Sequence, residues 1–205
     1  MLFSPTHQNI QDYNHQGFLV VDEVLPPAQL QSLHHAFDEV FSGRFETGIT
    51  PDEVNWQQGT GDPSLTRQIC NGWKANRSIA QVVLNEAIGR SVAKLAGWPG
   101  VRIMIDNLLW KPQGARSLGY HQDSAYLSWF SPSDLITCWI ALDDTSEAGG
   151  TLEFVSNKID ESKNKKTPAI TLASTGNISQ AGITFLTNKA IKDETGMNTL
   201  EFVSN

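Results

Sequence analysis

The sequence is poor in cysteine and has no long apolar run. Its two cysteines, Cys70 and Cys138, lack the spacing of a metal-binding or redox motif, which predicts reduced thiols rather than a disulfide framework. No stretch is apolar enough for a transmembrane helix. The N-terminal residues also lack the basic region and apolar run of a secretory signal. These absences predict a cytoplasmic protein with no membrane partner.

Positive charge is also scarce. The 205 residues carry a net charge of -7 and have a pI near 5.1, which argues against nucleic acid or an anionic membrane as a partner. Hydrophobic residues make up 40% and charged residues 18%, as in an ordinary globular protein. A chain of this length can bury one substantial core, so we predict a single main domain.

Several residue types are missing from the last part of the sequence. The last tryptophan is Trp139, the last arginine is Arg116 and the last histidine is His121. Residues 158–205 begin instead with a charge-rich, lysine-containing run, which is typical of a solvated loop. We therefore predict a main domain over residues 1–157, followed by an atypical tail over residues 158–205 that adds edge strands and is not a separate domain.

The tail repeats seven residues of the main domain. Thr151–Asn157 recurs letter for letter as Thr199–Asn205. Two isolated copies do not make a solenoid, which needs several degenerate copies at a short period. The repeat favours a duplication, an insertion or a reading-frame accident over selection of one strand at two places. It also predicts two identical strands that compete for one position in a sheet.

The local patterns predict helices in the first half of the chain and strands in the second half. Two segments have apolar residues at helical spacing, and short β-branched or alternating runs follow from residue 101 onward. This order predicts an α+β layout with a β-sandwich or barrel core. The expected elements are a strand over 17–21, a helix over 27–41, a long loop over 44–76, a helix over 78–96, strands over 101–110, 135–144 and 151–155, and edge strands over 169–173 and 183–187.

The tripeptide His121-Gln122-Asp123 carries the clearest chemical signal. On a strand, two residues separated by one other point to the same face, so His121 and Asp123 can reach one metal ion. They supply two of the three ligands of a 2-His-1-carboxylate site for non-haem Fe(II). Such a pair also occurs often by chance. The neighbouring histidines His34 and His35 lie on a predicted helix, and we interpret them as surface residues rather than ligands.

The surrounding residues make the signal more specific. A strand ending in Lys111-Pro112 comes first, and HQDSAY, Ser-Pro-Ser-Asp, CWIALDD and a Gly-Gly turn leading to LEFV follow in order. This ordered set resembles the phytanoyl-CoA dioxygenase family of Fe(II)/2-oxoglutarate oxygenases, over about residues 10–157. The resemblance implies N-terminal helices packed on a double-stranded β-helix of the jelly-roll or cupin type, incomplete or divergent at the C-terminus. It also implies Fe(II), 2-oxoglutarate as co-substrate and a small organic or acyl substrate.

The resemblance assigns roles to six residues. His121 and Asp123 match the metal ligands and would be catalytic. Gln122 lies between them and would face away or bend towards the co-substrate. Three further residues match the surroundings of the 2-oxoglutarate pocket, although packing or surface charge explains them equally well. These are Asn107, Lys111 and Trp139.

Two residues that the family normally supplies are absent downstream. These are the distal histidine of the triad and an arginine that pairs with the far carboxylate of 2-oxoglutarate through a fork that lysine cannot copy. A loose alignment places Lys192 at the histidine position, but a protonated lysine has no lone pair for a metal. Three interpretations remain: an active dioxygenase, an inactive small-molecule-binding or regulatory protein, and a truncated or rearranged member. The sequence does not indicate the oligomeric state.

Overall fold

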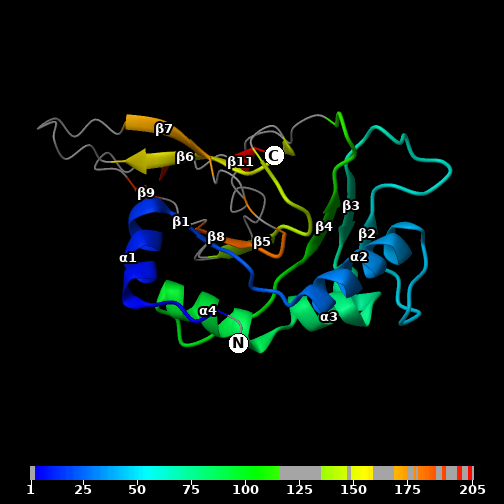
Figure 1. Cartoon of the computed structure of the whole chain (residues 1–205), viewed down its shortest axis with the longest axis horizontal. Coiled ribbons are helices and arrows are strands. Elements are labelled where there is room, and N and C mark those ends of the chain that lie inside the picture. The colour runs from blue at the N-terminus through cyan, green and yellow to red at the C-terminus, as the bar shows by residue number, and fades with distance from the viewer. Residues whose placement is uncertain are drawn as a thin grey trace, which may run out of the picture. The chain divides into compact units, whose positions relative to one another are not determined.

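The structure is a computed structural model, and it forms two compact units. One consists of Met1–Ser4 and Leu25–Arg116, and the other of Pro5–Val24 and Ser117–Asn205. Figure 1 shows the elements of both units. The residues that the structure describes are 3–115, 135–146, 149–158, 169–174, 178, 180–187, 191–192, 198–199 and 203–204.

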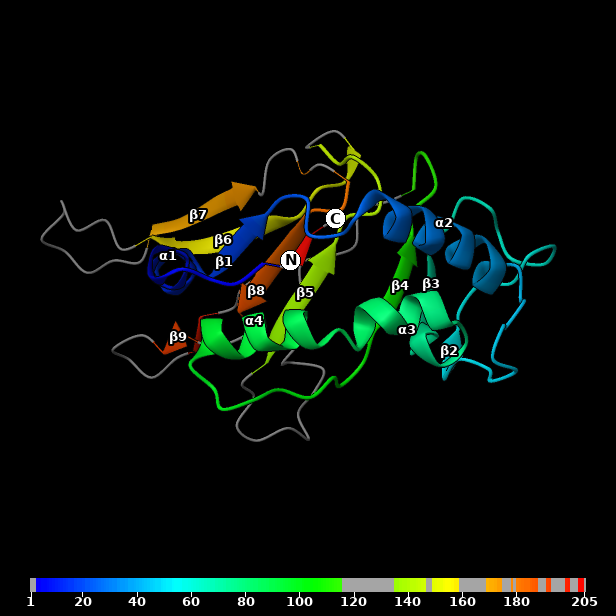
Figure 2. The ribbon, with the colours of Figure 1, turned by 60° about the horizontal axis from the view of Figure 1, so that its bottom comes forward.

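The first unit contains the helices α2 (Pro27–Phe41), α3 (Arg77–Val83) and α4 (Glu86–Ala96), with a 3-10 turn at Gly72–Lys74. Helix α2 begins with proline, whose fixed φ suits the first helical turn, and it ends just before Gly43, which has a φ of 80°. Figures 1 and 2 show α2 and α3 lying side by side, close to the strands of this unit. The buried side of α2 consists of Leu30, Leu33, Ala36, Val40 and Phe41.

The strands β2 (Glu53–Val54), β3 (Arg67–Cys70) and β4 (Asn107–Trp110) form an antiparallel sheet in the first unit, with β3 in the middle. Ile69 pairs with Leu108, and both are buried. Because strand residues alternate between faces, Arg67 and Trp110 share the face of this apolar pair. Gln68, Cys70 and Asn107 lie on the other face.

The second unit begins with α1 (His7–Gln16) and β1 (Phe18–Val21). Thr6 caps α1 by accepting a hydrogen bond from the Asn9 backbone N–H, and Gly17 ends the helix with a φ of 83°. Strand β1 pairs with β8 (Ile183–Thr187), which also pairs with β5 (Ile136–Ile140), so β8 is the central strand of an antiparallel sheet.

A second three-stranded sheet in this unit consists of β6 (Glu153–Lys158), β7 (Ala169–Ser174) and β11 (Val203–Ser204), with β6 in the middle. Figure 1 shows it above the sheet of β1, β8 and β5. A short pair of strands, β9 (Ile191–Lys192) and β10 (Asn198–Thr199), completes the set of described strands. The two copies of the repeated heptapeptide pair with each other here, because β11 belongs to the second copy and β6 to the first.

Several sequence expectations are confirmed and others are wrong. The predicted strand over 17–21 and the helix over 27–41 are confirmed as β1 and α2. The single helix expected over 78–96 is two helices, because Asn85 accepts hydrogen bonds from the backbone of Ala87 and Ile88 and begins a new one. The expected loop over 44–76 contains β2 and β3, and only the end of the stretch over 101–110 is a strand.

The edge position expected for residues 183–187 is also wrong. Strand β8 has a partner on each side, and Ile183, Thr184 and Phe185 are at most 1% exposed. The expectation for residues 169–173 is confirmed, since β7 lies at an edge of its sheet. Among the described residues, no helix combines the length and apolar character that crossing a membrane requires.

Candidate functional site

The residues assigned to the site fall in three places. Asn107 and Lys111 belong to the first unit and Trp139 to the second. His121, Gln122 and Asp123 lie outside the described residues, so their convergence on one metal ion stays a prediction. Lys192 lies in β9 opposite Asn198, and its proposed poor fit as a metal ligand likewise stays a prediction.

Asn107 begins β4 on the polar face of the first unit's sheet. Its Oδ1 atom accepts a hydrogen bond from Gln68 Nε2 at 3.1 Å and another from the Cys70 thiol at 3.1 Å. Both donors come from the neighbouring strand β3, so they fix the orientation of the Asn107 amide. Its Nδ2 group makes no hydrogen bond within the described part of the chain, and it remains able to donate to a ligand.

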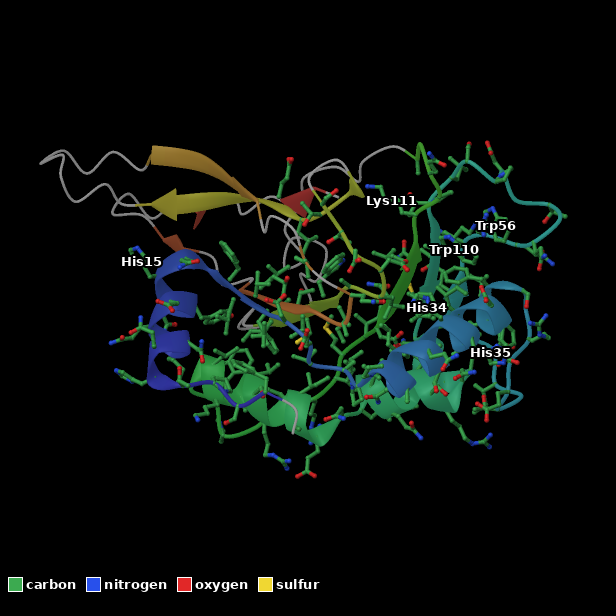
Figure 3. The ribbon with its side chains drawn as sticks, viewed as in Figure 1. His15, His34, His35, Trp56, Trp110 and Lys111 are labelled. Atoms are coloured by element: carbon green, nitrogen blue, oxygen red, sulfur yellow. The ribbon has the colours of Figure 1, made fainter. Side chains whose placement is uncertain are left out.

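Lys111 follows the last residue of β4 and is half-buried. Partial burial lowers the pKa of its amine, because an ammonium loses hydration energy on leaving water. No carboxylate of the described residues forms an ion pair with it. Figure 3 shows Lys111 close to Trp110, beyond the end of the strand. A partly desolvated amine without such a partner fits the carboxylate of a small-molecule ligand.

Trp139 lies on β5, directly opposite Thr184 of β8. Part of its ring packs against the buried pair Leu152 and Leu186. Trp139 therefore contributes to packing between strands, and it is half-buried. Lining of the co-substrate pocket stays a prediction for this residue.

Thr184 is a residue that the sequence analysis did not single out. It has 0% exposure, and its Oγ1 atom is buried without a hydrogen-bond partner among the described groups. Directly opposite residues of an antiparallel pair project from the same face, so this hydroxyl shares a face with Trp139. A buried hydroxyl without a partner is costly unless a ligand or water satisfies it. No sequence pattern marks it, because threonine is common in strands.

A second missed group is the arginine of β3. Arg67 stacks between Trp56 and Trp110. Recognition of this arrangement requires the β3–β4 register, which places Arg67 opposite Trp110. The sequence pattern predicted a loop over residues 44–76, and a loop gives no pairing that would connect Arg67 with Trp110.

The two cysteines are free thiols. Burial raises the pKa of the Cys138 thiol to about 12, and burial is also the largest cause of the raised pKa of Cys70, with Glu53 adding to it. Both thiols are therefore protonated near neutral pH and are poor nucleophiles. Neither suits a catalytic role.

Of the two adjacent histidines of α2, His34 is half-buried and His35 is exposed. His35 is 76% exposed, and its Nε2 atom lies 3.6 Å from the Glu39 carboxylate one turn along the helix. Figure 3 shows His34 and His35 on this helix. Within the described ranges, no group of three or more His, Cys, Asp or Glu residues is arranged to hold a metal ion.

Comparison with known proteins identifies a family. A sequence model of the family described as phytanoyl-CoA dioxygenase (PhyH) matches residues 13–181. The match continues past residue 157, where we expected the resemblance to end. No curated protein sequence matches the chain.

Solved structures with the same fold cover nearly the whole chain. The non-haem α-ketoglutarate-dependent carbocyclase SnoK from nogalamycin biosynthesis is 15% identical with a TM-score of 0.69, covering 100% of this chain and 85% of that chain. EctD from S. alaskensis, solved with bound Fe, is 12% identical with a TM-score of 0.71, and the coverages are 98% and 71%. HygX from Streptomyces hygroscopicus, solved with nickel, 2-oxoglutarate and hygromycin B, is 14% identical with a TM-score of 0.63, and the coverages are 98% and 81%. These structures confirm the predicted fold class, an α+β protein with a cupin-like β-core.

Proposed function

Because this chain belongs to the phytanoyl-CoA dioxygenase family, we propose that it binds Fe(II) and 2-oxoglutarate and that its oxidation of a small organic or acyl substrate is impaired. One observation carries the proposal. The motif His121-Gln122-Asp123 lies within the residues that match the family, and the present sequence has no histidine after His121 and no arginine after Arg116.

His121 and Asp123 are the residues that would hold the iron. An imidazole nitrogen and a carboxylate oxygen are the donor types of the 2-His-1-carboxylate site, so these two residues suit iron. The third protein ligand of such a site is missing. With bound iron and 2-oxoglutarate, and with O2 as the oxidant, the site would supply oxidation of a C–H bond. With two protein ligands in place of three, we expect a low affinity for the metal, because each ligand contributes to the binding free energy.

The remaining residues would bind and orient the organic ligands. The Lys111 amine is partly desolvated and unpaired among the described residues, which supports a role as the cation for a carboxylate of 2-oxoglutarate. A lysine binds such a group as a point charge and does not fix its orientation as a bidentate arginine does. Small displacements of a reacting group cost large factors in rate. Loose placement of 2-oxoglutarate is therefore one physical reason for impaired turnover.

Trp139 and Thr184 would form part of a pocket wall in the second unit. They share one face of the β5–β8 pair, and an aromatic surface beside a buried hydroxyl is typical of small-molecule sites. The same features fit an inactive family member that binds a small molecule and acts as a regulatory protein. Turnover distinguishes the two functions, because the second retains binding without release of succinate.

An anaerobic titration with Fe(II) in the presence of 2-oxoglutarate tests the proposal. We expect the weak visible absorption band of an iron–2-oxoglutarate complex, developing only at high metal concentration and absent in the His121→Ala and Asp123→Ala variants. A control variant, His35→Ala, removes an exposed histidine from α2 and should leave the band unchanged. A band of full intensity in the Asp123→Ala variant would contradict the assigned ligands.

A further inference from the structure

An arginine in the sheet of the first unit is held between two tryptophan rings. Arg67 begins the central strand β3, Trp110 lies opposite it on β4, and Trp56 lies in the segment between β2 and β3. The Arg67 Cζ atom is 3.8 Å from the centroid of the Trp56 ring and 4.5 Å from that of the Trp110 ring. Because the N–H bonds of a guanidinium group lie in its plane, packing against aromatic rings does not use these donors.

Both rings are themselves held in place. Trp110 contacts Phe41 of α2 edge to face, with ring centroids 5.6 Å apart. Trp56 donates from Nε1 to the backbone oxygen of Asp62 at 2.9 Å. A Cβ atom at Gly61 would lie 2.5 Å from the Trp56 ring, so only glycine allows the loop to pass this close. Figure 3 shows Trp56 and Trp110 near each other in this unit.

The edge of the Arg67 guanidinium has no acceptor among the described residues. No ion pair or hydrogen bond joins Arg67 to a carboxylate there, and its Nε atom is buried without a partner. Other arginines of the same unit are paired, since Arg77 contacts Glu46 and Arg90 contacts Glu86. A partly buried charge with unused donors is unfavourable unless an acceptor binds there.

We propose that Arg67, clamped between Trp56 and Trp110, binds the oxyanion group of a small molecule, either a carboxylate or a phosphate. The guanidinium edge presents parallel donors that match two oxygens of such a group. The half-exposed rings can contact the organic part of the same molecule. All three residues belong to the first unit, and binding there requires neither iron nor 2-oxoglutarate. Evidence against the proposed oxidation chemistry would therefore not be evidence against this anion-binding site.

Arginine side-chain NMR on the full chain without added metal tests the site. The Arg67 Nε–H resonance is identified by its absence from the Arg67→Lys variant. Benzoate, phenyl phosphate and benzamide are then titrated separately into the unsubstituted protein. We expect a saturable shift of this resonance with benzoate or phenyl phosphate, and none with benzamide, which has the same shape as benzoate without its charge. The anion that binds more tightly identifies carboxylate or phosphate as the recognised group.

Substitutions separate anion recognition from general charge effects. Arg67→Lys keeps the charge but loses the planar fork, and it should weaken binding of the preferred anion about tenfold or more in calorimetry. Arg102→Lys, at an exposed arginine of the same unit, is the matched control and should bind as before. Gly61→Ala keeps Arg67 and displaces the Trp56 ring, so it should also weaken binding. Gly100→Ala is its control, since a Cβ there meets no atom within 4 Å.

Two results would overturn the proposal. One is an Arg67 Nε–H resonance that neither anion shifts at millimolar concentrations. The other is a shift with benzamide equal to that with benzoate, which would indicate stacking of an aromatic ring without recognition of charge. If Arg67→Lys does not fold, the Gly61→Ala variant still tests the site. Unchanged anion affinity in this folded variant would contradict a role for the Trp56 ring in the clamp.

Discussion

Leu186 of β8 packs against Leu152, the residue immediately before β6, and the two side chains are 7% and 1% exposed. The contact joins the two three-stranded sheets of the second unit, because β8 belongs to one and β6 to the other. Phe18 and Trp139 pack against the same pair. Burial of apolar surface between two sheets is the main stabilising interaction in a β-core of this kind. Residues near 186 are therefore structural parts of this unit.

Truncation of Phe185 should destabilise the protein strongly. Phe185 is 1% exposed on the central strand β8, and removal of a buried phenylalanine ring costs about 3–5 kcal/mol of unfolding free energy. Urea denaturation of Phe185→Ala measures this loss. Leu65→Ala removes a side chain that is 57% exposed and should change stability by less than about 0.5 kcal/mol. Equal, small effects of both substitutions would show that β8 is not part of the core.

Replacement of Thr184 by valine should change stability and ligand binding in opposite directions. The buried Oγ1 atom has no partner in the described part of the structure, and an unsatisfied buried hydroxyl costs about 1–3 kcal/mol. Without ligand, Thr184→Val should unfold at a higher urea concentration than the unsubstituted protein. If the hydroxyl faces the ligand pocket, the variant should also bind 2-oxoglutarate more weakly in calorimetry. Lower stability without ligand would mean that the hydroxyl is already satisfied.

Asp106 predicts a pH dependence of stability. Burial raises the pKa of its carboxyl group above the ordinary value of 3.8. The folded state therefore binds the proton more tightly than the unfolded chain does. The stability that this group contributes is complete below the unfolded pKa, and it is lost as the pH rises through the higher folded value.

The substitution Asp106→Asn should therefore stabilise the protein relative to the unsubstituted chain as the pH rises from about 4 to neutral. Asparagine keeps an Oδ1 atom that can accept the hydrogen bond from the Trp73 backbone N–H. Asp52→Asn is the opposite control, because hydrogen bonds from Lys74 and Asn71 lower the pKa of Asp52. That variant should lose stability relative to the unsubstituted chain as the pH rises through the lowered folded pKa of Asp52 to the ordinary value of 3.8, which is a lower pH window than that of Asp106. Urea denaturation at several pH values measures the stability of each variant relative to the unsubstituted chain. If this difference changed with pH in the same direction for both variants, the raised pKa of Asp106 would be refuted.

Lys111→Met tests the binding of a carboxylate at the end of β4. Methionine keeps most of the side-chain volume and removes the charge. We expect weaker binding of 2-oxoglutarate, by about tenfold for a lost charge-assisted interaction, with little change in unfolding free energy. Lys94→Met is the control, since Lys94 is an exposed residue near the end of α4. Equal affinities of both variants would remove Lys111 from the proposed site.

The sequence was informative where one physical signal dominates. Apolar spacing and proline chemistry predicted α2, and the short apolar run at residues 18–21 predicted β1. Strand β3 was missed because the polar residues Arg67 and Gln68 are followed by Ile69 and Cys70, so polar and apolar residues do not alternate along its four residues. The break before α4 depends on the Asn85 cap, and an asparagine within an apolar helical pattern gives only a weak signal.

The candidate site shows the same limit. His121 and Asp123 could be proposed as metal ligands because their spacing and the surrounding motifs are local features of the sequence. Thr184 and the Trp56–Arg67–Trp110 stack depend on strand register, and no local pattern contains that information. The central position of β8 likewise follows from pairing with β1 and β5, which lie far away in the sequence.

The central proposal, that oxidation by this member of the family is impaired because no histidine follows His121 and no arginine follows Arg116 in its sequence, is tested most directly by succinate release from 2-oxoglutarate. The assay uses Fe(II), oxygen and the purified full chain, with Asp123→Ala as the comparison and circular dichroism as the check that both are folded. We predict that the unsubstituted protein releases succinate very slowly, and only slightly faster than Asp123→Ala. Rapid iron-dependent release that the Asp123→Ala substitution abolishes would contradict the account and would require a third metal ligand elsewhere in the chain.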